Sequence, residues 1–305
     1  MSSVFNVGKK HVFVLFAVLS LFTLTSCGVK YEEDSDGKPV VNEQGQRTVI
    51  NQIDKDSTFK EVYSEDGWFG GLIVYPLVKL ITFLGEALSS YGLAIILATL
   101  IVRGVALPIT LKSSKQQKKM QELNPKVQKV RLKYAGKTDR ESQMRMNAEV
   151  QKIYKDNNVS MLGGCWGMLI TMPIFFGFYS AIYRTPGIFS DPFLGLELDS
   201  SPQFQIFDQN HFVYIIPILL VFLFNFLSMR YTQNANKNPK ADVKRPYNAA
   251  SENAPDMMGQ QMKMMQYFMP IMMAFISFTL PVGVAVYFIA SSLVSVIQTI
   301  IIKKV

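Results

Sequence analysis

Arg103 is a single charged residue in an otherwise apolar stretch, residues 87–111. It lies nine positions before Lys112, which should mark the edge of a membrane, and that length of helix spans about 13 Å. Because an arginine side chain reaches about half of that distance, its guanidinium needs water, backbone carbonyls or a carboxylate within the membrane. The other apolar stretches contain no Asp or Glu. The sequence therefore predicts a water-filled recess around Arg103, a broken helix whose carbonyls bind it, or a carboxylate that another molecule supplies.

Other polar or reactive side chains in the apolar stretches are few. Asn225, Thr171 and Thr279 are candidates for a polar lining, although an isolated polar residue in a span commonly bonds to its own helix. Cys165 has no histidine near it in the sequence, and His211 lies in a polar loop, so no nucleophile–base pair is indicated. Two histidines do not make a histidine-rich metal centre, and no Walker-type glycine loop occurs. We predict a protein that is not an enzyme and that has no metal or cofactor.

Cys27 follows a segment with the order of a secretory signal: a basic start, a short apolar run over residues 12–24, and Leu-Thr-Ser directly before the cysteine. This pattern resembles the bacterial lipobox. We therefore predict that residues 1–26 are a lipoprotein signal peptide and that a lipid such as palmitate is attached to the sulfur of Cys27. An ordinary signal peptide with a chance cysteine is the alternative. The polar, acidic residues 27–66 then form an extracytoplasmic tether.

Four later stretches are long and nearly free of charge, as expected of membrane-spanning helices. The chain has 305 residues, 49% hydrophobic and only 18% charged, and this composition excludes overall disorder. The last stretch, 264–302, would form a helix of about 58 Å, which is too long for one span, and Pro281 with Gly283 predicts a turn inside it. We therefore predict an all-α polytopic membrane protein with five spans, at 87–111, 161–183, 212–229, 264–280 and 281–302.

The charges of the loops predict how these spans cross the membrane. Residues 112–160 hold 13 lysines and arginines against five acids, a net charge of +8, whereas residues 184–211 carry a net −3. The positive-inside rule places 112–160 in the cytoplasm, together with the loop 230–263 and the tail 303–305, and places 184–211 outside. A sixth span at 67–86 would invert every loop, so we predict that this segment is an interfacial amphipathic helix on the outer surface.

The basic segment 112–160 has the pattern of a helical hairpin. Apolar residues at spacings of three and four predict a helix over 112–135, which Pro125 should kink or divide. A capping-box sequence that begins at Thr138 predicts a second helix that ends near Asp156. The hairpin is either a solvated positive face near anionic lipid headgroups or a docking surface for a ribosome, a translocon or a nascent chain. It has no base-reading motif, so no nucleic-acid readout is predicted.

Three local stretches, in their order along the chain, resemble the YidC/Oxa family of membrane protein insertases over about residues 67–304. They are Leu100-Ile101-Val102-Arg103 through Leu107-Pro108, Met172-Pro173-Ile174-Phe175, and Phe268-Met269-Pro270-Ile271-Met272 followed by Leu280-Pro281-Val282-Gly283 and Tyr287. The lipobox is similar to that of members from Gram-positive bacteria. Two features depart from the family pattern. Phe288 stands where many relatives have tryptophan, and the tail ends at Val305 without the long basic extension of some relatives.

This resemblance implies a membrane protein insertase and chaperone that inserts newly made membrane proteins and helps them fold. It implies a hydrated groove that contains Arg103, with Asn225 as a further candidate. The implied partners are nascent membrane proteins, the lipid bilayer, the Sec translocon and the ribosome. The implied location is a bacterial cell membrane, with a lipid-anchored N-terminus outside and the C-terminus in the cytoplasm. The alternative is a small-solute transporter or channel that binds an anion at Arg103, although no duplicated pattern of spans supports it.

Overall fold

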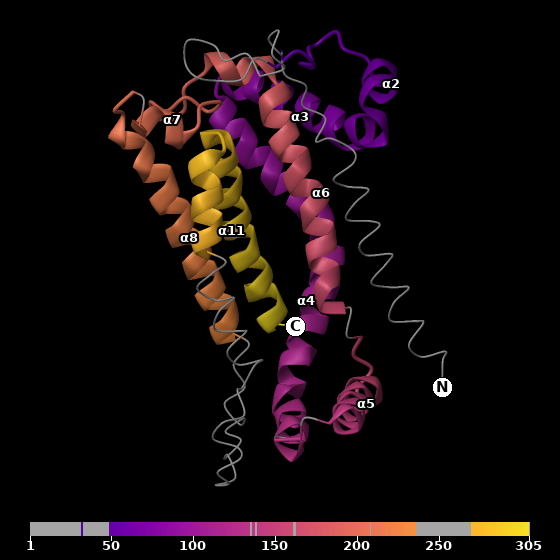
Figure 1. Cartoon of the computed structure of the whole chain (residues 1–305). Helices are drawn as coiled ribbons and strands as arrows, with labels where there is room; N and C mark the ends of the chain where they lie inside the picture. Colours follow the sequence, from indigo (N-terminus) through magenta and orange to yellow (C-terminus); the bar gives the residue numbers. More distant parts are fainter. Residues whose placement is uncertain are drawn as a thin grey trace. The chain divides into compact units, whose positions relative to one another are not determined.

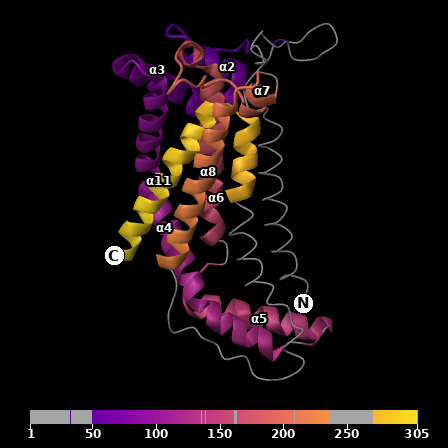
Figure 2. The ribbon, with the colours of Figure 1, turned by 90° about the vertical axis from the view of Figure 1, so that its left-hand side faces the viewer.

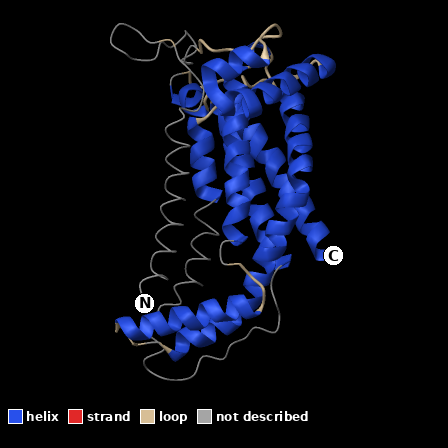
Figure 3. Cartoon of the chain, turned by 90° about the vertical axis from the view of Figure 1, so that its right-hand side faces the viewer, coloured by secondary structure: helices blue, strands red, loops and turns tan. Residues whose placement is uncertain are grey.

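The computed structural model describes residues 49–134, 136–137, 139–160, 163–207, 209–235 and 270–304, together with residue 32. The predicted signal peptide, Cys27 and most of the loop 230–263 lie outside the described residues. Figure 3 shows helices and loops and no strand in the described part of the chain. The prediction of an all-α fold is therefore confirmed.

Four of the described helices are long and apolar enough to cross a membrane. They are Phe59–Leu88, Tyr91–Lys133, Phe212–Thr232 and Val282–Ile302. Helices also occupy most of the described residues of the predicted second span (161–183) and fourth span (264–280): α6 (Gly163–Arg184) and a shorter apolar helix, Pro270–Thr279. The polytopic character is confirmed, whereas the number of five spans stays a prediction. Because Phe59–Leu88 also has the length and composition of a span, its placement along the outer surface stays a prediction too.

One compact unit of the chain comprises Met1–Tyr91 and Ile174–Asp199. Its long helical segment is built from α2 (Phe59–Phe69), a π-helical turn (Gly70–Val74) and α3 (Tyr75–Leu88). A capping box begins α2: Thr58 Oγ1 accepts a hydrogen bond from the Glu61 N–H, and the Glu61 carboxylate accepts one from the Thr58 N–H. This cap starts a short helix inside the segment that the sequence assigned to the tether, and the backbone leaves helical angles at Gly67 (φ 68°, ψ −162°) before the helical segment continues.

Gly177 brings the second half of α6 close to α3 and the π-helical turn of the same unit. A Cβ atom at this position would lie 2.7 Å from Ile73 Cγ2 and 2.9 Å from Leu77 Cδ1, which is closer than real Cβ contacts. Small residues are used in this way where membrane helices approach each other closely. The side chains of Val78, Ile81 and Ile182 are fully buried in this unit.

Arg184, at the end of α6, forms a buried ion pair that the sequence did not predict. Its Nη2 atom lies 2.6 Å from Asp66 Oδ2, and the two side chains are 2% and 1% exposed. Arg184 Nε donates to the Asn51 carbonyl at 2.7 Å, and the Ile53 N–H donates to the Arg184 carbonyl at 2.9 Å. Burial lowers the pKa of Arg184, and the Asp66 carboxylate opposes that shift. These contacts fasten residues 49–66 to the end of α6.

The other compact unit comprises Gly92–Pro173 and Ser200–Val305. Its longest element, α4 (Tyr91–Lys133), is one helix of 43 residues that continues through Pro108 and Pro125. The helix is therefore not divided at Pro125, and the alternative prediction, a kink at this residue, stays a prediction. A proline removes a single backbone hydrogen bond, while its fixed φ angle is itself helical, and the helix on both sides of Pro125 remains intact.

The C-terminal half of this second unit contains a pair of neighbouring helices. Figures 1 and 2 show α8 (Ile215–Ala235) beside α11 (Val282–Lys304), and these two helices make extensive contact. Before α8 the chain forms α7 (Pro202–Phe207) and a short 3₁₀ helix, Phe212–Tyr214. The helix Pro270–Thr279 ends just before α11 begins. The Val282 N–H, at the start of α11, donates to the carbonyl of Ser200, which precedes α7, at 3.0 Å.

The basic segment forms a hairpin from the end of α4 and α5 (Arg140–Asp156), and this hairpin has a core of its own. The core consists of Leu123, Val127, Val150, Tyr154 and Val159. The cap of α5 is Asp139, whose carboxylate accepts from the Ser142 N–H at 2.7 Å. Glu149 on α5 accepts hydrogen bonds from Lys133 Nζ and Tyr134 Oη, both at 2.7 Å, and these bonds lower the pKa of Glu149.

Candidate functional site

Arg103 belongs to a polar stripe along α4. Thr99, Arg103, Thr110 and Ser113 follow one another at spacings of four, seven and three residues, so they lie near one face of the helix. All four are at most 9% exposed, whereas Val105, on the other side of α4, is 76% exposed. The helix thus presents an apolar side to its surroundings and a polar side, with one charge, to the rest of its unit.

The guanidinium of Arg103 is held by Tyr287 on α11. Arg103 Nη2 donates to Tyr287 Oη at 3.2 Å, and the guanidinium carbon lies 6.0 Å from the centroid of the tyrosine ring. Tyr287 is 1% exposed. The hydroxyl is a neutral acceptor and the ring a weak one, so Tyr287 orients the positive charge without neutralising it.

No acidic residue pairs with Arg103 within the described ranges, whose ion pairs all involve other residues. The Nε atom of Arg103 is also buried and has no hydrogen-bond partner there. A buried donor on a charged group costs free energy until an acceptor reaches it. The site therefore has the electrostatic character of a receptor for an acceptor or an anion.

On the C-terminal side of Arg103 along α4, hydrogen bonds between uncharged side chains connect α4, α8 and α11. Gln298 Nε2 on α11 donates to Thr110 Oγ1 on α4 at 3.0 Å. The hydroxyls of Thr232 on α8 and Thr299 on α11 lie 3.0 Å apart. Both contacts are formed by side chains that donate and accept equally well, and neither involves a charge.

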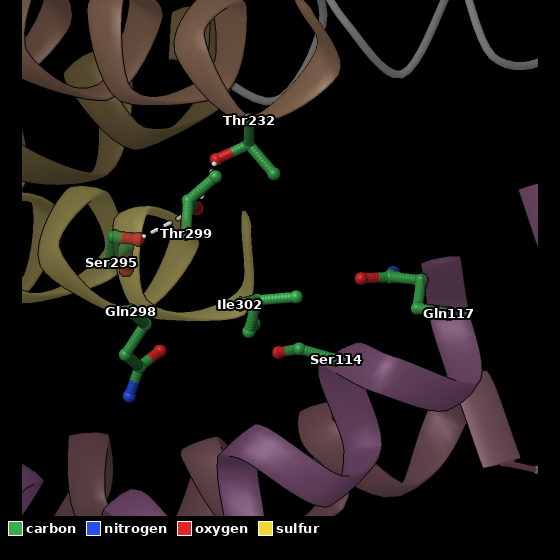
Figure 4. Close-up of a pocket in the computed structure, with 7 residues that line it drawn as sticks. All are labelled: Ser114, Gln117, Thr232, Ser295, Gln298, Thr299 and Ile302. Carbon is green, nitrogen blue, oxygen red and sulfur yellow. Dashed lines mark hydrogen bonds between the residues drawn. The ribbon is translucent and has the colours of Figure 1, made fainter. Parts of the chain in front are cut away.

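Next to these contacts lies a cavity of about 190 Å³ (Figure 4). Its lining comes from α4, α8 and α11 and consists of Ser114, Gln117, Thr232, Ser295, Gln298, Thr299 and Ile302. Six of these seven side chains are polar and none is charged. A volume of this size is enough for several water molecules, at about 30 Å³ each. A polar, uncharged cavity therefore lies within the same unit as Arg103.

Two of the polar residues that the sequence suggested for the lining, Asn225 and Thr279, form hydrogen bonds within their own helices. Asn225 on α8 donates to the Val221 carbonyl one turn earlier at 2.9 Å, and Thr279 donates to the Ile276 carbonyl. Both side chains thus bond to their own helices, and the assignment of Asn225 to the groove stays a prediction. Cys27 falls outside the described residues.

Sequence reasoning did not identify the cavity, although a signal for it was present. Ser291, Ser295, Gln298, Thr299 and Ile302 follow one another on α11 at spacings of four, three, one and three residues. This is the periodicity of one helical face, and four polar residues along it in a predicted span indicate a polar interior. Tyr287 belongs to a motif in the predicted fifth span, and nothing in its sequence neighbourhood indicates a partner on α4.

Comparison with known proteins relates most of the chain to one family. Residues 83–305 match the family model described as 60Kd inner membrane protein. The membrane protein insertase YidC of Oceanobacillus iheyensis is 35% identical over 242 residues, which cover 79% of this chain and 86% of that protein. The membrane protein insertase MisCA of Bacillus subtilis is 32% identical over 251 residues, which cover 81% of this chain and 84% of that protein.

A solved structure of an active YidC insertase with its first transmembrane domain resolved is similar with a TM-score of 0.48 and 20% identity. The match covers 78% of this chain and 51% of that chain, so this protein spans about half of its length. The family match, by contrast, covers residues 83–305, and the alignments with the two relatives extend over most of both sequences. The chain therefore belongs to the YidC family, described as the 60Kd inner membrane protein family.

Proposed function

We propose that this protein inserts newly made membrane proteins into the bacterial cell membrane and assists their folding. The relatives named as YidC and MisCA insertases support this function. The observation that carries the mechanism is Arg103, a buried positive charge that has a neutral hydroxyl as its partner and a buried Nε donor with no acceptor in the described chain.

In this mechanism the polar side of α4, with Arg103, forms part of a hydrated groove. A short polar tail of a client enters the groove, and an acidic residue of that tail pairs with Arg103. The apolar segment of the client then moves into lipid along the outside of the helices. Burial of about 20 apolar residues in the membrane supplies the driving force, so the step needs no catalytic residue and no cofactor.

The location of the chain follows from the same proposal. The protein lies in the cell membrane with the basic hairpin and the C-terminus in the cytoplasm, and a lipid on Cys27 anchors the N-terminus outside. Labelling with a radioactive fatty acid should mark the wild type and not Cys27→Ala. Retained label in that variant would reject the lipid anchor.

The Sec translocon and the ribosome are proposed partners, and the net charge of +8 on residues 112–160 supports an acidic surface as their point of contact.

The insertion mechanism is tested with matched clients that have acidic or neutral tails, at equal levels of each variant. Arg103→Lys should retain most of the insertion of acidic clients because the charge is kept. Arg103→Ala should impair acidic clients and Arg103→Glu should impair them more, while neutral clients are spared. Val105→Ala on the exposed side of α4 is the control. Equal loss for both clients would reject the electrostatic role and favour a structural one.

Reconstitution into proteoliposomes separates this proposal from an anion transporter or channel. Uptake of small anions by the pure protein, without insertion of any client, would support the transporter. Insertion without uptake supports the insertase.

A further inference from the structure

We infer that the uncharged cavity between α4, α8 and α11 binds the polypeptide backbone of a client tail, about five residues away from the client residue that pairs with Arg103. This inference rests on the proposed function and adds to it a second, sequence-independent subsite. It rests on the chemistry of the cavity lining, on the orientation of two of its side chains, and on the distance from Arg103.

The chemistry of the lining fits peptide groups. Its polar members are two serines, two threonines and two glutamines. Hydroxyl and amide side chains both donate and accept hydrogen bonds, which is what a peptide N–H and C=O require. A charged client side chain would lose its hydration there without meeting an opposite charge, and that loss is costly. The cavity therefore suits backbone and neutral polar groups whatever the sequence of the tail.

The α4 side of the cavity offers the groups for such contacts. In Figure 4 hydrogen bonds join Thr299 to Thr232 and to Ser295 on the α8 and α11 side of the cavity, and Ser114 and Gln117 lie on its α4 side. Both side chains extend from α4 toward Ile302 on α11 (Figure 4). Their donors and acceptors face the space that a bound segment would occupy.

The distance to Arg103 can be worked out along two helices independently. Ser114 follows Arg103 by 11 residues on α4, and Gln298 follows Tyr287 by 11 residues on α11. A helix of that length spans about 16 Å. An extended chain covers about 3.3 Å per residue, so about five client residues separate the two subsites. Charge recognition and backbone recognition thus act on different parts of one tail.

The test uses the full-length protein with Ser114→Cys as the probe and with Cys165→Ser, which removes the thiol that the proposed lipid on Cys27 does not block. The client has one acidic residue in an otherwise neutral tail and a single cysteine that is moved along the tail. Disulfide cross-linking during arrested insertion should peak about five residues from the acidic residue, about tenfold above the positions beside it, which corresponds to about 1.4 kcal/mol. The peak should stay in place when the neutral residues are changed between serine, asparagine and alanine.

Leu223→Cys on the exposed side of α8 is the control and should show no such peak. As a second measurement, Gln117→Leu should lower the insertion of acidic and neutral clients by the same factor, about fivefold for one lost hydrogen bond. Normal insertion with no cross-link at Ser114→Cys, or with cross-links spread evenly along the tail, would overturn the subsite and leave the proposed function intact. Failure of the parent protein to insert either client would overturn the proposed function and this inference with it.

Discussion

Tyr287→Phe is the substitution that isolates the hydroxyl contact of Arg103. It removes the acceptor 3.2 Å from Arg103 Nη2 and keeps the aromatic ring whose centroid is 6.0 Å from the guanidinium. Hydrogen bonds to charged groups contribute about 1.5–3 kcal/mol to the stability of proteins. Side-chain hydrogen bonds between membrane helices contribute about 0.6 kcal/mol on average, with a maximum of about 1.7 kcal/mol. We therefore expect Tyr287→Phe to lower the unfolding free energy by about 1–2 kcal/mol.

The assay is reversible unfolding in detergent for the wild type, Tyr287→Phe, Arg103→Ala and the double variant. The coupling energy between the two sites should be about 1 kcal/mol, because the second substitution has no contact left to break. Tyr231→Phe, a half-exposed tyrosine on α8, is the control and should change stability by less than about 0.5 kcal/mol. Additivity within about 0.3–0.5 kcal/mol would show that the hydroxyl does not hold the guanidinium. In insertion assays Tyr287→Phe should still distinguish acidic from neutral clients, since the charge of Arg103 remains.

Three further sets of substitutions test other parts of the chain. Removal of one partner of the buried pair, as in Arg184→Met or Asp66→Asn, should lower the unfolding free energy by about 3–5 kcal/mol; a loss below about 1 kcal/mol in thermal unfolding would contradict a buried, paired charge. Gly177→Ala should destabilise by about 1–3 kcal/mol because its Cβ overlaps two side chains, whereas Gly104→Ala, with no atom within 4 Å of its Cβ, should be neutral or stabilising; similar effects at both positions in the same assay would be evidence against close packing. The lowered folded-state pKa of Glu149 means that its contribution is present above the unfolded pKa of about 4.3 and is lost as the pH falls through the folded pKa. Glu149→Gln should therefore speed amide exchange in α5 at neutral pH, and the difference from the wild type should shrink as the pH is lowered into the acid range; a difference independent of pH would reject this contact.

The sequence allowed the prediction of whatever depends on local composition. A charge within an apolar stretch drew attention to Arg103, whose role in a groove stays a prediction, and a proline and a glycine inside an overlong apolar stretch indicated the turn before α11. It did not predict contacts between distant residues: Tyr287 lies 184 positions from Arg103, and nothing near either residue indicates the other. The Asp66–Arg184 pair was missed for the same reason, since each residue alone has the pattern of a solvated loop charge.

Two local predictions differed from the structure because each sequence pattern is compatible with more than one local conformation. The acidic residues before position 67 were assigned to a tether, but Thr58 and Glu61 form a cap that begins a helix there. Pro125 indicated a kink or a division, but a proline disturbs only the turn before it, and the helix continues on both sides of this residue. Both outcomes depend on contacts beyond the residue itself.

The core of the basic hairpin has a consequence for the order in which the protein itself is made. All of its members lie within residues 120–159. The ribosome therefore adds every residue of this core to the chain before it adds the apolar stretch that follows. Contacts of such short sequence separation form quickly compared with translation, which adds about 5–20 residues per second. We expect the folded, positively charged hairpin to fix the direction of α4 while the C-terminal part of the chain is still unmade. Under the proposed function the protein must enter a membrane before it can help other proteins do so, and we expect its first orientation step to be encoded in its own sequence.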